Sequence, residues 1–312
     1  MNRETKSVRN EYGKTLTELG KINPDIVVLD ADLSCSTQTK MFAKEFPERF
    51  FNVGIAEQDL MTTAAGLACS GKIPFVSTFA MFAAGRAWDQ VRNTISYSNL
   101  NVKICATHGG ITVGEDGASH QALEDVSLMR SIPNMIVIVP ADARETKLAV
   151  EFAANYNGAV YIRIARTNLP DVYDDNYRFD YKKAVVMREG KDVTIITNGE
   201  TLIEVLDCAD DLQKKGINAE VISVPVVKPI DSETIIKSAK KTNRVITVEN
   251  HSVIGGLGSA VCEVLSENYP VKITRIGTKD EFGQSGTAKE LMAYYGLNAE
   301  KLTEQIAGII KK

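Results

Sequence analysis

The sequence lacks the features that identify several classes of protein. Its five cysteines (Cys35, Cys69, Cys105, Cys208 and Cys262) are far apart and odd in number. None forms a C-x-x-C pair, so neither a zinc site nor a disulfide framework is indicated, and a reduced, cytoplasmic setting is the simplest account. No apolar run approaches the roughly 20 residues that a membrane helix needs. The polar N-terminus lacks the apolar core of a signal peptide. A net charge of −4 gives no indication of binding to nucleic acid or to an anionic membrane.

What remains is an ordinary globular composition in which strands and helices alternate. The 312 residues are enough for about two domains, with 44% hydrophobic and 24% charged residues. Short apolar runs predict strands, and helical spacing between them predicts helices. The predicted strands are 26–29, 50–56, 74–79, 102–107, 135–139, 159–164, 193–196, 220–227, 244–249 and 271–276. The predicted helices include 9–21, 61–68, 85–96 and 143–155.

Repeated strand–helix units predict an α/β fold with two domains, each a mainly parallel sheet flanked by helices. The acidic, aperiodic stretch around residues 168–190 interrupts the alternation, and we interpret it as a crossing linker. The predicted boundaries are 1–178 for the first domain, 179–189 for the linker and 190–312 for the second domain.

Glu57 directly follows an apolar, strand-like run at residues 50–56. The turn after a parallel strand is where α/β proteins place ligand groups, and water is scarce there. Desolvation disfavours the charged form of such a carboxylate unless it is paired. An alternative is that Glu57 and Asp59 simply occupy the first turn of a helix, where acids complement the helix dipole.

Residues 107–121 form the most unusual segment. They contain two of the three histidines, His108 and His120, together with Glu115, Asp116 and four glycines, directly after a predicted strand. Glycine permits close approach of the backbone to a ligand, and histidine suits proton transfer near neutral pH. The alternative is a glycine-rich surface loop with satisfied histidines. No third nitrogen or sulfur ligand is evident nearby, so we expect no metal site.

Aromatic and basic side chains follow other predicted strands. Phe79 and Phe82 are three residues apart, which at helical spacing would let them share one face as a stacking platform, although core packing is the ordinary interpretation. A guanidinium fork fits a phosphate, but any single arginine could equally be solvated or paired. The candidate anion-binding residues are Arg9, Arg86, Arg163 and Arg166.

Taken together, these stretches resemble the C-terminal half of the transketolase family of thiamine diphosphate enzymes. The resemblance covers essentially the whole chain, and its most specific part is the Gly-Glu-Asp-Gly-x-x-His-Gln string at residues 114–121. The other matching stretches, in chain order, are Val8-Arg9, Ala31-Asp32-Leu33-Ser34-x-Ser36, Gly54-Ile55-Ala56-Glu57-Gln58, Thr78-Phe79-x-x-Phe82, Thr107-His108 and Ile164-Ala165-Arg166.

The resemblance implies a pyrimidine-binding domain followed by a transketolase C-terminal domain, and it implies roles for individual residues. Glu57 is similar to the glutamate that hydrogen-bonds N1′ of the aminopyrimidine, and His120 to a histidine near the thiazolium. The resemblance implies catalytic residues Glu57, His108 and His120, and cofactor-binding residues Glu57, Phe79, Phe82, Asp32 and Arg86. It implies substrate-binding residues Arg9, Ser36, His108, Asp116, His120 and Arg166, with Asp116 reading the configuration of substrate hydroxyls.

One departure from the family pattern concerns the other end of the cofactor. A full transketolase has an N-terminal domain whose Gly-Asp-Gly motif and downstream Asn hold Mg²⁺ and the diphosphate, and neither motif is found here. The chain therefore resembles the C-terminal subunit of a split transketolase in the pentose phosphate pathway. We expect an N-terminal subunit as partner, an α₂β₂ assembly, sugar phosphate substrates, and no activity of the isolated chain.

Two relatives with the same cofactor are alternatives. The β subunit of a 2-oxo acid dehydrogenase has the same layout but needs no sugar phosphate site, so Ser36, His108, Asp116, His120 and Arg166 disfavour it. A 1-deoxyxylulose-5-phosphate synthase shares Ala56-Glu57-Gln58 but is normally one long chain. A non-catalytic binding module is disfavoured by the presence of Glu57 with both histidines.

Overall fold

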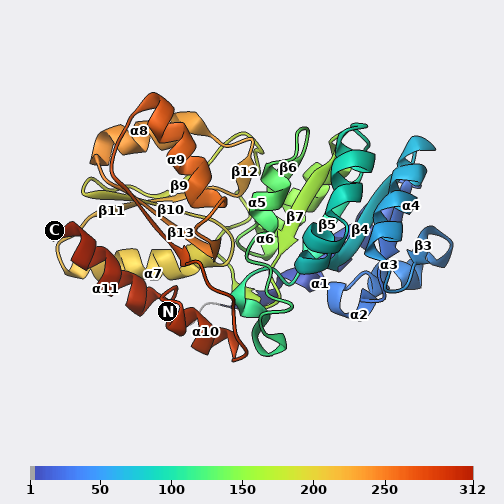
Figure 1. Ribbon diagram of the computed structural model, residues 1–312, viewed down its shortest axis with the longest axis horizontal. Helices are drawn as coiled ribbons and strands as arrows, with labels where there is room; N and C mark the ends of the chain where they lie inside the picture. The colour runs from blue at the N-terminus through green and yellow to red at the C-terminus, as the bar shows by residue number, and fades with distance from the viewer. Residues whose placement is uncertain (1–3, 312) are drawn as a thin grey trace.

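The computed structural model describes residues 4–311, so the outermost predicted domain ends, residues 1–3 and 312, lie outside the described part. Two sheets with flanking helices lie side by side (Figure 1). The first part of the chain contains β1 (Thr5–Ser7), α1 (Val8–Ile22), β2 (Ile26–Asp30), α2 (Ser34–Thr37), α3 (Lys40–Glu45), η1 (Pro47–Arg49), β3 (Phe50–Asn52), α4 (Glu57–Cys69), β4 (Ile73–Phe79), η2 (Phe82–Arg86), η3 (Gln90–Ser96), β5 (Lys103–Thr107), η4 (Ile111–Asp116), α5 (Asp125–Arg130), β6 (Ile136–Ile138), α6 (Ala143–Asn155), β7 (Val160–Ile164) and β8 (Asn168–Pro170).

The rest of the chain forms the second sheet and its helices, and it also supplies one strand, at residues 226–228, to the first sheet. It contains β9 (Val185–Arg188), β10 (Val193–Thr197), α7 (Thr201–Lys214), β11 (Ala219–Ser223), β12 (Val226–Lys228), α8 (Ser232–Thr242), β13 (Val245–Ser252), α9 (Leu257–Asn268), β14 (Ile273–Thr278), α10 (Ala288–Tyr294) and α11 (Ala299–Ile310). The mainly parallel sheets flanked by helices confirm the predicted α/β fold class.

The first sheet has the order β12-β6-β7-β5-β4-β2-β3, and all its pairings are parallel except that of β12 with β6. Successive strand residues face opposite sides, as the pleat requires. Val28 and Phe75 lie in the core cluster with α1, α3 and α6, whereas Leu29 and Val76 lie in the cluster with α4, η3 and α5. Helices therefore cover both faces, and the ligand-accessible part of the sheet is the edge where its strands end.

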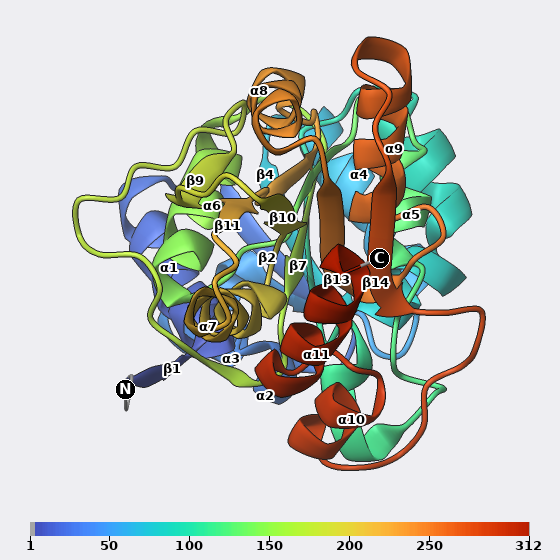
Figure 2. The same cartoon turned by 90° about the vertical axis from the view of Figure 1, so that its left-hand side faces the viewer.

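The second sheet has the order β14-β13-β10-β11-β9, with only β9 antiparallel to its neighbour. Helices α7, α10 and α11 pack on one face and α8 and α9 on the other, as Figure 2 shows for α7, α8 and α11. The pattern of residues 193–196 explains this arrangement, because Ile195 packs with the first group and Ile196 with the second.

Two local predictions were wrong. The predicted strand 220–227 is two strands in different sheets, because Pro225 lacks the N–H that a central ladder requires and the chain crosses over at this point. β12 then pairs with β6 of the first sheet, and Val139 N donates to Pro225 O at 2.7 Å. The run at 50–56 was expected to be a buried strand, but β3 is a partly exposed edge strand. The stretch interpreted as a linker includes β9, which pairs with β11.

Candidate functional site

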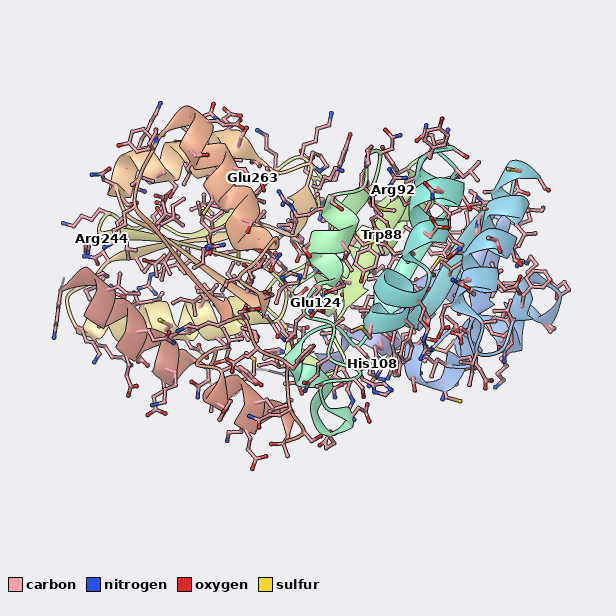
Figure 3. The ribbon with its side chains drawn as sticks, in the orientation of Figure 1. Trp88, Arg92, His108, Glu124, Arg244 and Glu263 are labelled. Atoms are coloured by element: carbon pink, nitrogen blue, oxygen red, sulfur yellow. The ribbon has the colours of Figure 1, made fainter. Side chains whose placement is uncertain are left out.

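The carboxyl edge of the first sheet brings together residues that are far apart in the sequence. Five neighbouring parallel strands, β7, β5, β4, β2 and β3, end at this edge. Figure 3 labels His108 there. Each strand is followed by predicted site residues, and Arg9 joins them because it lies in the first turn of α1. The residues that follow the strands, from β7 to β3, are Arg166, His108, Phe79, Phe82, Asp32, Ser36 and Glu57.

An aromatic stack forms the centre of this edge. The rings of Phe79 and His108 are stacked with centroids 3.9 Å apart, and those of Phe79 and Phe82 are nearly parallel at 5.8 Å and 15°. His120 meets the ring of Phe82 edge-on at 5.4 Å. The stack brings two imidazoles and two phenyl rings together, an arrangement that suits contact with a planar heteroaromatic ligand.

Glu57 lies at one end of the stack. Its side chain is only 4% exposed, and its Oε1 forms an ion pair with Arg86 Nη1 at 3.1 Å. The Arg86 guanidinium in turn covers the ring of Phe82 at 4.2 Å. A carboxylate this dry is costly without a partner. The Arg86 side chain is 54% exposed, so the ion-pair partner of Glu57 Oε1 lies on the solvent side of the site.

Basic side chains lie at the other end. Arg9 Nη1 donates to the backbone oxygen of Ser36 at 2.8 Å, and burial together with the charge of Arg166 lowers the pKa of Arg9. Burial, and then the charges of Arg9, Arg166 and His120, lower the pKa of His108 to about 3. His108 is therefore neutral at physiological pH, with its Nδ1 2.8 Å from Thr107 Oγ1. Two guanidinium groups beside a neutral imidazole suit the binding of a phosphate group.

The loop after β5 reaches its position through unusual backbone conformations. His108 has φ of 62° and Gly110 has φ of 81°. A Cβ at Gly110 would lie 2.4 Å from Asn250 Nδ2, so only glycine allows the loop to approach that side chain. Gln121 Nε2 donates to Ile111 O at 3.1 Å and to Gln284 O at 3.0 Å. Gly110 and Gln121 therefore serve packing of the loop against the second part of the chain.

Comparison with known proteins identifies the family of the chain. Residues 4–172 match the model of the transketolase pyrimidine binding domain, and residues 182–302 match that of the transketolase C-terminal domain. The chain belongs to the transketolase family. A protein named as a transketolase C-terminal section from Methanocaldococcus jannaschii is 52% identical over 98% of this chain and 97% of that protein.

Two other transketolase relatives carry different substrates in their names. A 6-deoxy-6-sulfo-D-fructose transketolase subunit from a Clostridium species is 42% identical, covering 95% of this chain and 92% of that protein. One of the subunits of an apulose-4-phosphate transketolase from Phocaeicola vulgatus is 41% identical over 97% of each chain. A solved structure described as a split gene transketolase, inactive β4 tetramer, is 53% identical with a TM-score of 0.91 and 98% coverage of both chains.

Some predicted site residues of this transketolase chain lie away from the aromatic stack. Asp32 is exposed, has φ of 63° and accepts a hydrogen bond from Asn52 Nδ2 at 3.1 Å, so it lies towards the β3 edge of the sheet. Asp116 is exposed at the end of η4. Neighbouring Glu115 pairs with Arg166 at 2.9 Å, which ties the loop to the basic end of the site.

Arg163 was wrongly grouped with the anion-binding candidates. Its side chain is 7% exposed, and its Nε lies 3.0 Å from Asp125 Oδ2 in a buried ion pair. Its two Nη atoms donate to Asn250 O at 2.9 Å and to Ala122 O at 3.1 Å. Sequence analysis also missed Glu200 and Asn250, which contact the loop from the C-terminal domain. A polar Asn250 directly after a predicted apolar strand was the available signal.

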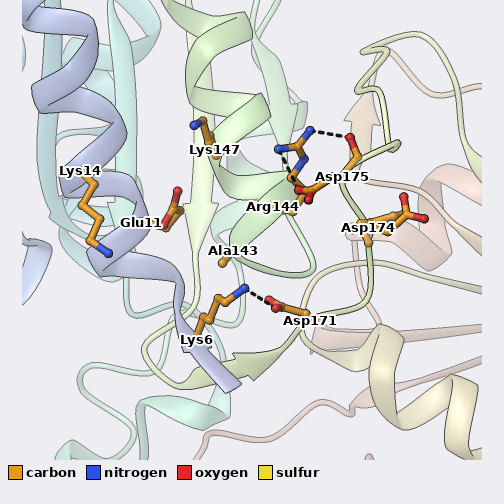
Figure 4. Close-up of a pocket in the computed structure, with 10 residues that line it drawn as sticks. Lys6, Glu11, Lys14, Ala143, Arg144, Lys147, Asp171, Asp174 and Asp175 are labelled. Carbon is orange, nitrogen blue, oxygen red and sulfur yellow. Dashed lines mark hydrogen bonds and ion pairs between the residues drawn. The ribbon is translucent and has the colours of Figure 1, made fainter. Parts of the chain in front are cut away.

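A separate hollow of about 470 Å³ lies between α1 and residues 171–175. Figure 4 shows its charged lining, in which Lys6 pairs with Asp171 and Arg144 with Asp175. None of the predicted site residues lines it. Among residues 4–311, no cluster of three or more His, Cys, Asp or Glu side chains could hold a metal ion. No helix within that range is long and apolar enough to cross a membrane.

Proposed function

We propose that this chain is the C-terminal subunit of a thiamine diphosphate-dependent transketolase. It transfers a two-carbon ketol unit from a ketose phosphate to an aldose phosphate, together with an N-terminal subunit. The observation that carries the proposal is the continuous row from the dry carboxylate of Glu57, along the stacked rings of Phe82, Phe79 and His108, to the basic end of the site. The extents of the two domains, 1–178 and 190–312 with 179–189 between them, are part of the proposal.

The residues at the carboxyl edge fit the pyrimidine end of the cofactor. When bound, thiamine diphosphate supplies a nucleophilic carbon that accepts and then releases the two-carbon unit. Phe79 and Phe82 would hold the aminopyrimidine, and Glu57 would share a proton with its N1′. The carboxyl group of Glu57 suits this task because it is only 4% exposed, so water does not compete for its hydrogen bonds. Arg86 covers the Glu57 carboxylate from the solvent side. Asp32 would bind the cofactor from the β3 edge of the sheet.

The other end of the row holds the sugar phosphate. Arg9 and Arg166 pair with the phosphate, with Ser36 beside Arg9. His108, being neutral, donates one N–H to a substrate oxygen, while His120 holds or moves a proton near the reacting carbon. Asp116 reads a substrate hydroxyl. The relatives described above have 6-deoxy-6-sulfo-D-fructose and apulose 4-phosphate in their names. We therefore propose phosphorylated or similarly anionic sugars as the class of substrate, without specifying one donor and one acceptor.

The diphosphate and its Mg²⁺ are assigned to the N-terminal subunit, and we propose an α₂β₂ assembly. The match to a relative named as a transketolase C-terminal section, over 97% of that protein, supports this division. The exposed Phe51 and Ile55, 40% and 77% accessible beside Glu57, provide apolar surface for the partner. The cytoplasmic location stays a prediction from the unpaired cysteines.

The test is reconstitution with an N-terminal transketolase section, thiamine diphosphate and Mg²⁺, followed by a two-carbon transfer assay with xylulose 5-phosphate and ribose 5-phosphate. Glu57→Ala should reduce kcat by about 100-fold to 10,000-fold, the usual range for loss of acid–base catalysis. Asp59→Ala is the matched control, since Asp59 is an exposed acid in the same helical turn. Turnover by this chain alone, or equal effects of the two variants, would refute the proposal. Pyruvate oxidation without ketol transfer would favour the 2-oxo acid dehydrogenase alternative.

A further inference from the structure

The C-terminal domain encloses the loop that carries both site histidines. In a sheet of the order β14-β13-β10-β11-β9, the strand order reverses between β13 and β10, which is where open α/β sheets bind ligands. Here the space next to these two strands is filled by protein. Ile111 of the loop is fully buried and belongs to the same core cluster as Ile195 and Val248. The loop itself therefore occupies the place of a ligand.

Asn250, near the end of β13, contacts this loop through both of its side-chain groups, since its Nδ2 donates to Thr112 Oγ1 at 3.3 Å. Its Oδ1 accepts a hydrogen bond from Ile111 N at 3.0 Å. Its Nδ2 donates to Glu200 Oε1 at 2.5 Å, and Thr112 Oγ1 donates to the same oxygen at 2.7 Å. Asn250 and Glu200 are 3% and 8% exposed. These buried hydrogen bonds fix the backbone of Ile111 and the side chain of Thr112, which lie three and four residues after His108.

Glu200 also reaches a second loop of the site. Its other oxygen, Oε2, accepts a hydrogen bond from Thr167 Oγ1 at 3.3 Å. Thr167 directly follows Arg166, which pairs with Glu115 of the histidine loop. A single buried carboxylate thus joins the loop after β5 to the loop after β7. Its loss would leave the donors of Thr112 and Asn250 unsatisfied in a dry environment.

We propose that Glu200 and Asn250 are positioning residues that hold His108, His120 and Arg166 in register for the sugar phosphate. The inference rests on the proposed function and adds a catalytic task for the C-terminal domain. Neither residue contacts the aromatic stack, so their effect passes through the two loops. Glu57, by contrast, is held by α4 and Arg86, so cofactor binding should not depend on this pair.

The residue before Asn250 provides a matched control. Glu249 is 2% exposed, and its carboxylate accepts hydrogen bonds from Leu257 N at 2.7 Å and Gly258 N at 2.9 Å, at the start of α9. It is as buried as Asn250 and lies on the same strand, but its hydrogen bonds support a helix of the C-terminal domain. Glu249→Ala should therefore destabilise the domain and leave the loops in place.

The experiment compares Asn250→Leu and Glu249→Ala in the reconstituted enzyme with thiamine diphosphate and Mg²⁺. Asn250→Leu removes the side-chain hydrogen bonds to Ile111, Thr112 and Glu200 and keeps the side-chain size. Misplacement of the loop should lower kcat/KM for the ketose phosphate by about 10-fold to 100-fold. In Asn250→Leu, the thiamine diphosphate concentration that gives half of the full activity should stay within about twofold of the wild-type value. In Glu249→Ala, kcat/KM for the ketose phosphate should also stay within about twofold of the wild-type value. Both variants should lower Tm.

A second pair of variants avoids any failure to fold. Thr112→Val removes only the hydroxyl that donates to Glu200 and should lower kcat/KM by a few-fold. Thr112→Ser keeps this hydroxyl, so its kcat/KM should stay at the wild-type value. Wild-type kcat/KM in Asn250→Leu or Thr112→Val would overturn the inference. Equal losses in Asn250→Leu and Glu249→Ala for equal changes in Tm would also overturn it.

Hydrogen exchange on the full chain separates this inference from the proposed function. The amides of residues 110–114 should exchange faster in Asn250→Leu than in the wild type or in Glu249→Ala. If the reconstituted wild type transfers no ketol unit, the proposed function fails, while this exchange pattern still supports a loop held by Asn250. Unchanged exchange in Asn250→Leu would overturn the positioning of the loop whatever the activity.

Discussion

Replacing His108 with asparagine should remove a defined part of the dependence of the protein's stability on pH. Asparagine tolerates the positive φ of 62° at this position and does not titrate. Burial, and then Arg9, Arg166 and His120, lower the pKa of His108 from 6.5 to about 3. The unfolded chain therefore binds a proton at this position below about pH 6.5, but the folded protein does not until about pH 3.

The sign and size of the effect follow from this difference. The stability that neutral His108 allows is fully present above its unfolded pKa and falls as the pH drops towards its folded pKa. The full loss corresponds to about 5 kcal/mol of unfolding free energy, at roughly 1.4 kcal/mol for each pH unit between the two values. Between pH 7 and pH 5 the loss from His108 alone is about 2 kcal/mol.

Urea denaturation of the full chain at pH 7 and pH 5 measures this quantity. The unfolding free energy of the wild type should fall by about 2 kcal/mol more than that of His108→Asn over this interval. Other titrating groups cancel in the comparison. Thr107→Val is the control, because it removes the 2.8 Å partner of Nδ1 and leaves the imidazole in place, so the larger pH dependence should persist. Equal pH dependence in wild type and His108→Asn would refute the assignment of His108 as a buried, neutral side chain.

Three further substitutions test the packing behind the site. Asp125→Ala should lower the unfolding free energy by about 3–5 kcal/mol because it leaves the buried Arg163 without its ion-pair partner, and a loss below about 1 kcal/mol in urea titration would contradict this. Ile111→Ala should cost about 2–5 kcal/mol, since the side chain is fully buried; an unchanged denaturation midpoint would mean that the loop does not pack there. Asp30→Ala should raise KM for the ketose phosphate with little change in kcat, because its carboxylate organises the loop that carries Ser36, accepting from Leu33 N at 2.6 Å. Steady-state kinetics with an unchanged KM would contradict that role.

The sequence predicts the parts of the fold and site that depend on local pattern. Apolar runs and helical spacing locate the strands and helices, and parallel strands bring their carboxyl ends to one edge. Phe79, His108 and Arg166 could therefore be expected to lie close together before any coordinates were known. The three-residue spacing of Phe79 and Phe82 also predicted the contact between their rings.

Long-range partners could not be predicted in the same way. Asn250 bonds to Ile111 across 139 positions, and no local period records such a pairing. The burial of Arg163 could not be predicted for the same reason, because it depends on Asp125 and on the C-terminal domain. Its residue type alone suggested anion binding. Glu57 is buried as expected, but its cover comes from the start of α4 and Arg86, since β3 is a partly exposed edge strand.

The crossing strand β12 has a consequence for how this gene could have been assembled or recombined. Residues 226–228 complete the sheet of the preceding domain by pairing with β6, so the second half of the protein contains a strand that the first half needs. A chimera that exchanges the last third of the chain between relatives inherits a foreign edge strand for its first sheet. Natural breakpoints in such genes should therefore fall outside this stretch, and a cut at the apparent domain border should yield an N-terminal fragment that exposes β6 and self-associates.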